Sequence, residues 1–401
     1  MKLKTNRKWL LIPIALLLVC LLGVAAIFVA NLFLPTGSAV VERLSADEKA
    51  RLAEAFHLRQ TVGAAVWPGW DEAEIPLVVY NETYAFLVDY PAEPPAGWRP
   101  VPGDEGIGNP WERLPDDTFF GEPYYRTRLP RQDVTPQAFT IRIGDAWVAS
   151  MPTKEWAEIR LADEFRQDLP GFLRAVFPYG PIVRLFLGGS DKHVSLLLHE
   201  SFHAFEGIVA PERLVTAEQV GRRYEGQYPW DGPGLEAAWQ AELDLLADAA
   251  EQAVDGGSTA EVTALAQQFL DHRAARRQAA GLSQDLIEYE QQREWVEGQA
   301  KYMELAMWRL AATTAGYTPH PEVATLDDFD AYRGADTAWS REIDQIRRMA
   351  GDEGDGRFYY SGLAQAILLD RLLPGWKEQA MDGDVFLEGL LAMAIESMTE
   401  E

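Results

Sequence analysis

The hydrophobic and polar positions of this chain divide it into three stretches, and the first is a continuous apolar run near the N-terminus. No residue from Trp9 to Leu34 is charged. A helix needs about 20 apolar residues to cross a bilayer core, whereas the apolar part of a cleaved signal peptide normally covers only about 7–15 residues. The pattern therefore predicts one uncleaved transmembrane helix over 9–34, with Cys20 inside the membrane.

Charge on the two sides of this run predicts its orientation. Small, apolar or acidic residues follow the run, and four basic residues precede it: Lys2, Lys4, Arg7 and Lys8. The positive-inside rule then makes 1–8 a cytoplasmic tail. The chain after Pro35 is expected to be extracytoplasmic, as in a single-pass membrane protein with a signal anchor.

The second stretch, 35–153, has short hydrophobic segments between many prolines and glycines. Its first part, 35–60, is expected to be a juxtamembrane linker with one helix over 45–60, because Ser45 suits an N-cap and apolar residues recur at helical spacing. The remainder, 61–153, is expected to be a strand-containing N-terminal part. Its predicted strands are 75–80, 84–88, 139–143 and 146–150, paired as two hairpins.

In the third stretch, 154–401, the apolar spacing is helical throughout. Glycine, proline and aspartate interrupt it between helices predicted at 155–177, 192–209, 234–255, 258–280, 283–313, 336–349, 361–373 and 385–398. The chain is therefore expected to be an α+β protein, with a mostly helical larger part after a smaller strand-containing part.

Composition narrows the possible functions. The chain has 36 basic and 62 acidic side chains, so its formal net charge is −26. Nucleic acid is excluded as a partner, because a phosphate backbone requires clustered Lys and Arg. Since the single cysteine lies in the apolar run, any metal in the remainder must be held by His, Asp or Glu.

The strongest chemical signal is His199-Glu200-Ser201-Phe202-His203, inside the predicted helix 192–209. Side chains four residues apart share a helix face, so His199 and His203 can bind one Zn²⁺ together. Glu200 would then lie close enough to a zinc-bound water to act as its general base.

A catalytic zinc site of this kind needs a third protein ligand. The favoured residue is Glu297, beside Gly298 and Ala300, whose small side chains would let its helix approach the histidine helix. Other carboxylates remain open as the third ligand: Glu304, Glu294, Glu242 and Glu236.

Glu297-Gly298-Gln299-Ala300-Lys301-Tyr302, together with the HExxH motif, resembles the gluzincin branch of the zincin metallopeptidases. In that family a glutamate on a later helix completes the site, often in a Glu-Gly-x-Ala-x-aromatic setting. The resemblance implies a zincin-like catalytic part at 154–401 that hydrolyses peptide or protein substrates. It also implies an edge strand that pairs with the substrate, for which the hairpin over 139–151 is the candidate.

The same resemblance implies a Tyr or His downstream of the third ligand that stabilises the oxyanion. Tyr359 and Tyr360 are the main candidates, and His320 is a weaker one. Lys301 stands where some gluzincins have a group that orients a ligand histidine, so Glu304 is expected to serve instead, and Glu206 is expected to be a hydrogen-bond acceptor near the site.

The other aromatic and histidine residues are expected to be structural. The Trp-rich segment 67–111 is expected to serve packing, and three histidines are expected at the surface or in a second layer: His57, His193 and His272.

A different class of function stays open. The chain could be a noncatalytic, membrane-anchored envelope protein that binds a partner, with the HExxH helix purely structural. Zinc content separates the two hypotheses.

Overall fold

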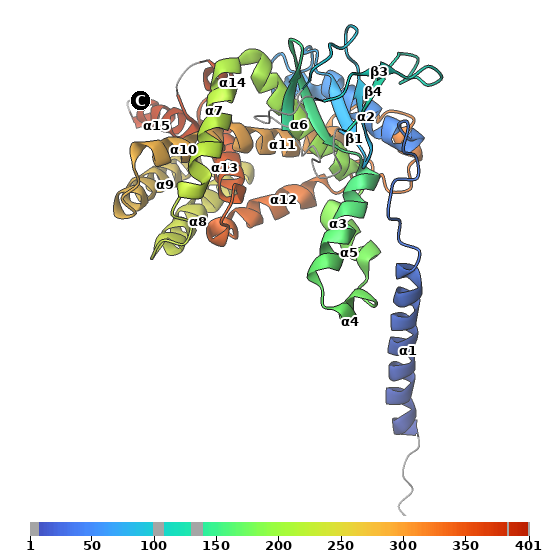
Figure 1. The fold of residues 1–401 in the computed structure, drawn as a ribbon. Coiled ribbons are helices and arrows are strands. Elements are labelled where there is room, and N and C mark those ends of the chain that lie inside the picture. The colour runs from blue at the N-terminus through green and yellow to red at the C-terminus, as the bar shows by residue number, and fades with distance from the viewer. Residues whose placement is uncertain (1–7, 99–107, 130–138, 383–384, 400–401) are drawn as a thin grey trace, which may run out of the picture.

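The computed structural model describes residues 8–98, 108–129, 139–382 and 385–399, so residues 1–7 of the tail predicted at 1–8 lie outside them. Its first element, α1 (Lys8–Asn31), projects away from the rest of the molecule (Figure 1). The window Ile14–Asn31 has a mean hydropathy of 2.7 and no buried residue. This helix is long and apolar enough to span a membrane, although it ends three residues before the predicted boundary.

The strands form one mixed sheet in the order β3-β4-β2-β1-β6-β5. Their bounds are β1 (Leu77–Tyr80), β2 (Tyr84–Val88), β3 (Glu112–Arg113), β4 (Tyr125–Arg128), β5 (Phe139–Ile143) and β6 (Ala146–Pro152). β1 is parallel to β6, and the other neighbours are antiparallel. The four predicted strands and both hairpins are confirmed. β3 and β4 escaped prediction because they are short and carry charged residues rather than an alternating apolar pattern.

Helix α2 (Ala46–Val66) begins as predicted, with the Ser45 side chain accepting a hydrogen bond from the backbone N–H of Glu48. It continues six residues beyond the expected end. Leu52 and Leu58 are buried in the main hydrophobic core, so the segment expected in a juxtamembrane linker includes a core helix.

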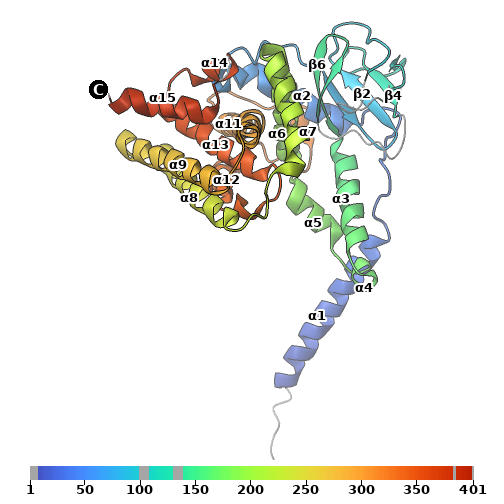
Figure 2. The ribbon, with the colours of Figure 1, turned by 60° about the vertical axis from the view of Figure 1, so that its left-hand side comes forward.

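Two helices occupy the range 155–177, for which a single helix was predicted, and a third, unpredicted helix follows them. They are α3 (Lys154–Asp168), α4 (Gly171–Arg174) and α5 (Tyr179–Leu187). The prediction is wrong after Asp168 because Pro170 has no N–H to continue the helix and disfavours helical geometry at Leu169, which is extended. Together α3, α4 and α5 form a hairpin-like unit that points in the same direction as α1 (Figures 1 and 2).

The remaining helices build the larger part of the molecule. They are α6 (Ser190–Val209), α7 (Pro211–Tyr224), α8 (Leu235–Val254), α9 (Thr259–Ala279), α10 (Gln284–Arg293), α11 (Gln299–Thr313), α12 (Ala335–Ile346), α13 (Gly356–Leu372), α14 (Trp376–Met381) and α15 (Leu387–Thr399). α7 and α14 were not predicted, and α13 begins five residues earlier than expected. The mostly helical α+β architecture is confirmed.

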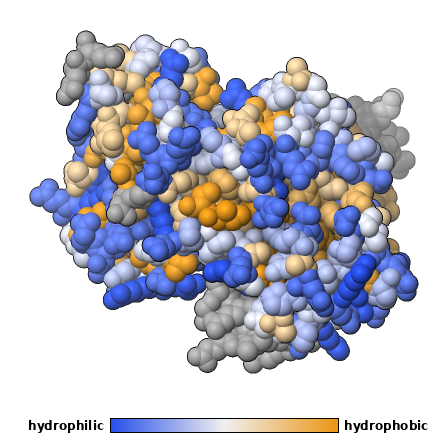
Figure 3. Space-filling view, turned by 90° about the horizontal axis from the view of Figure 1, so that it is seen from above, coloured by the Kyte–Doolittle hydropathy of each residue, from blue (hydrophilic) through white to orange (hydrophobic). Residues whose placement is uncertain are grey.

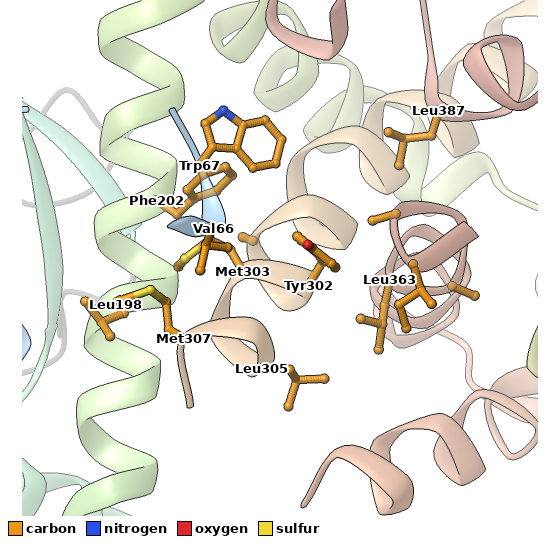
Figure 4. Close-up of a cluster of buried hydrophobic side chains, with 14 of the residues drawn as sticks. Val66, Trp67, Leu198, Phe202, Tyr302, Met303, Leu305, Met307, Leu363 and Leu387 are labelled. Carbon is orange, nitrogen blue, oxygen red and sulfur yellow. The ribbon is translucent and has the colours of Figure 1, made fainter. Parts of the chain in front are cut away.

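Packing between α6 and α11 positions the candidate site. Figure 4 shows Leu198 and Phe202 of α6 facing Met303 and Met307 of α11, all within the main core. Trp67, at the end of α2, packs edge-on against Phe202 with ring centroids 4.8 Å apart. These apolar contacts hold α11 along α6, which brings the segment before α11 to the histidine helix.

Candidate metal site

Helix α6 presents the HExxH motif as its sequence predicts. Leu198 and Phe202 are fully buried on the core side of the helix, and this fixes the direction of the other faces. His199 and His203, one turn apart, bring their Nε2 atoms within 3.2 Å of each other.

Glu297 reaches the two histidines from a distortion in the neighbouring helix. α10 continues as a π-helix over Glu294–Gly298 before α11 begins, and short π-helical segments often occur at functional sites. A Cβ atom at Gly298 would lie 2.4 Å from Cα of Gly362 in α13. The expectation that Gly298 faces the histidine helix is therefore wrong. Gly298 lets α13 approach, and this contact supports the π-helix.

His199, His203 and Glu297, called the histidine cluster below, form a compact triangle of possible metal ligands. Oε2 of Glu297 lies 3.5 Å from Nε2 of His199 and 3.4 Å from Nε2 of His203. Zinc bonds of about 2.0–2.1 Å at tetrahedral angles separate ligand atoms by about 3.3 Å. The three sides of the triangle agree with that spacing, so the residues fit a zinc ion.

One carboxylate oxygen that faces both histidines has no hydrogen-bond donor in the described part of the chain. Oε2 of Glu297 is buried and accepts no hydrogen bond among the described residues, which is costly unless a cation binds there. Burial opposes charge here, yet Arg293 and His203 hold the pKa of Glu297 well below its usual range. Burial also disfavours protonated His203, but Glu297 and Glu206 raise its pKa well above 6.5. The surroundings thus favour a positive charge between these side chains.

A second set of carboxylates orients the possible ligands. Oε2 of Glu206 lies 2.8 Å from Nδ1 of His203, and Oε2 of Glu304 lies 3.6 Å from Nδ1 of His199. Both side chains are buried. Carboxylates in these positions fix the ring that binds a metal through its other nitrogen. Both residues lie where the sequence predicted them, although Glu304 is beyond hydrogen-bond distance.

Two cations that flank the cluster were not predicted as parts of the site. Nη2 of Arg293 donates to Oε1 of Glu297 at 2.6 Å and to Asp355 at 2.6 Å. Nζ of Lys301 lies 3.2 Å from Glu304. The four-residue spacing of Arg293 and Glu297 was a usable signal for an ion pair on one helix, but nothing local pointed to Asp355.

A cavity of about 840 Å³ opens next to the histidine cluster. Glu200, His203 and Glu297 line one side of it, and Thr140, Ile141 and Arg142 of β5 line another. β5 is an edge strand of the sheet. The hairpin predicted to border the cleft therefore does so, through its first arm.

Glu200 and Tyr359 both line this cavity beside the possible ligands. Burial raises the pKa of the Glu200 carboxyl, which brings it closer to neutral pH, where a general base is most effective. The Tyr359 ring stacks on His199 with a centroid distance of 5.7 Å and an interplanar angle of 4°. Burial and the nearby Glu297 carboxylate raise the pKa of Tyr359 well above its usual value, so its hydroxyl keeps its proton.

The structure does not bring Tyr360 or His320 to the site. The Tyr360 hydroxyl donates to Glu342 at 2.5 Å, because adjacent residues of a helix point about 100° apart. The His320 ring packs against Phe120, and His320 does not line the cavity.

Three of the four rival third ligands lie elsewhere, and the fourth, Glu304, faces the other ring nitrogen of His199. Glu236 is exposed on α8, and Glu242 and Glu294 belong to a buried network of ion pairs. This arginine cluster consists of Arg273, Arg276, Arg277, Glu242, Glu290, Glu294 and Glu388. Within the part of the chain that the structure describes, only the histidine cluster groups three such ligand atoms.

The other histidines are outside the histidine cluster, as expected. His193 is buried and lies 3.3 Å from Glu48, His57 is half-buried and His272 is exposed. Most of the Trp-rich segment serves packing, since Trp67 and Trp70 are buried in the core. Trp98 differs because it also lines the cavity.

Comparisons of the chain with models of known protein families, with curated proteins and with solved structures found no match. The function is therefore inferred from the geometry of the site and from the motifs in the sequence.

Proposed function

We propose that this chain is a zinc metallopeptidase of the gluzincin type. The observation that carries the proposal is the triangle of His199, His203 and Glu297, with ligand atoms 3.2–3.5 Å apart, at the wall of a cavity. Three protein ligands leave a fourth tetrahedral position for water or substrate, as in catalytic rather than structural zinc sites.

Two of the residues that line the cavity, Glu200 and Tyr359, have a part in this chemistry. Bound Zn²⁺ supplies Lewis acidity, which polarises a carbonyl and acidifies water. Glu200 accepts the proton of the attacking water and returns it to the leaving amine. Tyr359, protonated and beside His199, donates a hydrogen bond to the oxyanion.

The edge strand supplies the reason to prefer a peptide as the substrate. Among the residues that the structure describes, β6 is the single strand paired with β5, so the outer N–H and C=O groups of β5 are available for an extended chain. Pairing of this kind binds peptides through their backbone, and it would align the scissile bond along the cavity wall beside Glu200.

The proposal includes the location of the enzyme. α1 would anchor the protein in a membrane, because it has the length and hydropathy of a spanning helix. The basic residues that precede the apolar run favour a cytoplasmic N-terminus. The cavity would then act on extracytoplasmic peptides or proteins.

Zinc content and hydrolysis of a peptide library, measured on the full chain in mild detergent, test this function. The wild type should bind one zinc ion, and His199→Ala/His203→Ala should bind none. Glu200→Gln should keep the zinc and lose about 10²–10⁴-fold in rate, because it removes a general base and not a ligand.

Glu322→Gln, which changes an exposed loop carboxylate, is the matched control and should leave both measurements unchanged. Absence of zinc in a metal-replete wild-type preparation would instead support a noncatalytic partner-binding protein. Full activity of Glu200→Gln would disprove the mechanism.

A further inference from the structure

The α3–α5 unit carries a cluster of apolar side chains that the rest of the protein does not cover. Phe172, Leu185 and Phe186 are 76%, 77% and 64% exposed, and Leu173 is 38% exposed. Among the described residues after Phe33, the first three are the most exposed large hydrophobic side chains. Phe172, Leu173, Leu185 and Phe186 are called the apolar tip below.

The apolar tip is not the inner face of the unit. Tyr179 and Val183 of α5 are buried against Ala162 of α3, so α5 already has a covered apolar face. Leu185 and Phe186 extend from another side of the same helix. A helix that is apolar on nearly all sides normally lies in a core or in a membrane, and soluble surfaces rarely leave such residues grouped and exposed.

Hydrogen bonds join this unit to the end of the membrane-spanning helix. Nδ2 of Asn31, the last residue of α1, donates to the carbonyl oxygens of Ala175 at 3.1 Å and Phe177 at 2.9 Å. Leu34 packs against the buried side of the unit. Figures 1 and 2 show α4 at the end of the unit that lies nearest α1.

These contacts set the depth of the apolar tip. The apolar window Ile14–Asn31 rises about 27 Å as a helix, close to the roughly 30 Å of a bilayer core. Asn31 therefore lies near the boundary between hydrocarbon and headgroups. Phe172 is only three residues from Ala175, whose carbonyl Asn31 binds. The Phe165 ring of α3 contacts the rings of both Phe177 and Phe186, so the apolar tip lies near the same boundary.

The charge of this segment suits a lipid surface. Residues 169–189 contain two arginines, Arg174 and Arg184, and no acidic residue, in a chain with 62 acidic residues overall. Both arginines are exposed. Apolar side chains with arginines beside them are typical of segments that lie in the interface of a membrane, where the guanidinium groups meet anionic headgroups.

The face at the opposite end of the molecule is different. Figure 3 views the protein from the side away from α1, and hydrophilic residues cover much of this face around separate hydrophobic patches. α15, which bears the exposed Met393, lies away from α1 in Figure 1. It provides a control position far from the expected membrane.

We infer that the apolar tip inserts into the membrane interface beside α1, so that the protein contacts the bilayer through two elements rather than one. The inference rests on the proposed membrane anchor and is independent of the zinc chemistry. Two contact points would restrain the tilt of the sheet and of the cavity relative to the membrane, which a single helix with a short connection does not do.

Lipid-quenching fluorescence on the full chain tests the inference. Cys20, the single native cysteine, is labelled with an environment-sensitive fluorophore to report on α1. In a Cys20→Ser background, Phe172→Cys, Phe186→Cys and Met393→Cys are labelled in the same way. Each protein is reconstituted in phosphatidylcholine–phosphatidylglycerol vesicles with or without nitroxide-labelled lipid.

The labels at positions 20, 172 and 186 should lose most of their fluorescence with nitroxide lipid, while the label at 393 keeps it. If the label at 20 is quenched but the label at 172 or the label at 186 is not, the lipid contact is overturned and the anchor remains. A blue shift at 172 and 186 without quenching would also overturn it, because a second protein chain would then cover the tip. No quenching at 20 would overturn both the anchor and the contact.

Discussion

Two clusters of buried ionisable side chains meet at the π-helix Glu294–Gly298, and they differ in how completely their polar atoms are paired. Glu294, in the arginine cluster, accepts two hydrogen bonds from Arg273, at 2.5 and 2.7 Å, and another from Ser361. Glu297, in the histidine cluster, accepts one from Arg293 and leaves Oε2 without a donor among the described residues.

The comparison shows that buried charge does not by itself identify a functional site. Both glutamates are buried, and both come from the same five-residue segment. Glu294 has hydrogen-bond donors for both of its carboxylate oxygens, as expected for a group that holds helices together. Glu297 faces two imidazoles and a cavity, and its Oε2 atom has no hydrogen-bond donor among the described residues. An unpaired buried acceptor of this kind is expected of a residue that could bind a metal.

Lowering the pH should give the largest difference between the two clusters, because they lose their interactions at different pH values. Burial opposes ionisation of Glu290 and Glu388, but the arginines outweigh it and lower the pKa of each to about 2. Their stabilisation is complete above about pH 4.5 and is lost as the pH falls towards 2, on the order of 3 kcal/mol each. Protons compete with zinc for the imidazoles of His199 and His203, so zinc should leave before these glutamates are protonated, while the pH is still above about 4.5.

Zinc release and far-UV circular dichroism, recorded over the same pH series, check this order. Loss of helix at the same pH as loss of zinc would contradict it, because the fold would then depend on the metal rather than on the arginine cluster.

Removal of one partner from the arginine cluster should mainly affect the fold. In Glu294→Ala, Arg273 loses two of its hydrogen bonds, and breaking a buried ion pair costs about 3–5 kcal/mol in unfolding free energy. Urea denaturation of the metal-free protein measures this loss. The folded fraction should still bind one zinc ion per chain, and a zinc-free but stable variant would place Glu294 among the ligands.

Removal of Glu297 should mainly affect zinc binding and change the stability of the fold little. Zinc binding to protein sites amounts to about 10–16 kcal/mol, so the loss of one ligand among a few should remove on the order of 3 kcal/mol, or about 100-fold in affinity. Competition with a chelator measures the zinc affinity of Glu297→Ala. Its metal-free stability should change little, because Arg293 keeps Asp355 as a partner. Unchanged zinc affinity would remove Glu297 from the ligand set.

The carboxylates behind the histidines should have the smallest effect. Glu206→Gln should weaken zinc binding about 10- to 100-fold, as is typical for groups that orient a ligand. Glu304→Gln should weaken it less, because its nearest oxygen is 3.6 Å from His199 Nδ1 whereas Glu206 lies 2.8 Å from His203. The same chelator competition ranks the two variants. A larger loss of zinc affinity in Glu304→Gln than in Glu206→Gln would contradict this order.

Features that depend on neighbours in the chain were predictable from the sequence. The four-residue spacing of His199 and His203 placed them together because any α-helix does so. Ser45 capped α2, and the Gly144-Asp145 turn closed the β5–β6 hairpin, because capping and turn formation need only a few adjacent residues. The apolar run predicted a helix long and apolar enough to span a membrane, because length and composition alone define such a helix.

Only the tertiary structure decided which distant groups meet. Glu294 and Glu297 are both acidic residues in one predicted helix. The packing of α11 against α6 and of α10 against α7, with α13 against Gly298, sends them to different clusters. Tyr359 and Tyr360 are adjacent and chemically identical, but the orientation of α13 turns only Tyr359 to the cavity. Helical periodicity gives the relative directions of side chains on one helix, whereas the partner that each face meets is set by long-range packing of the whole core.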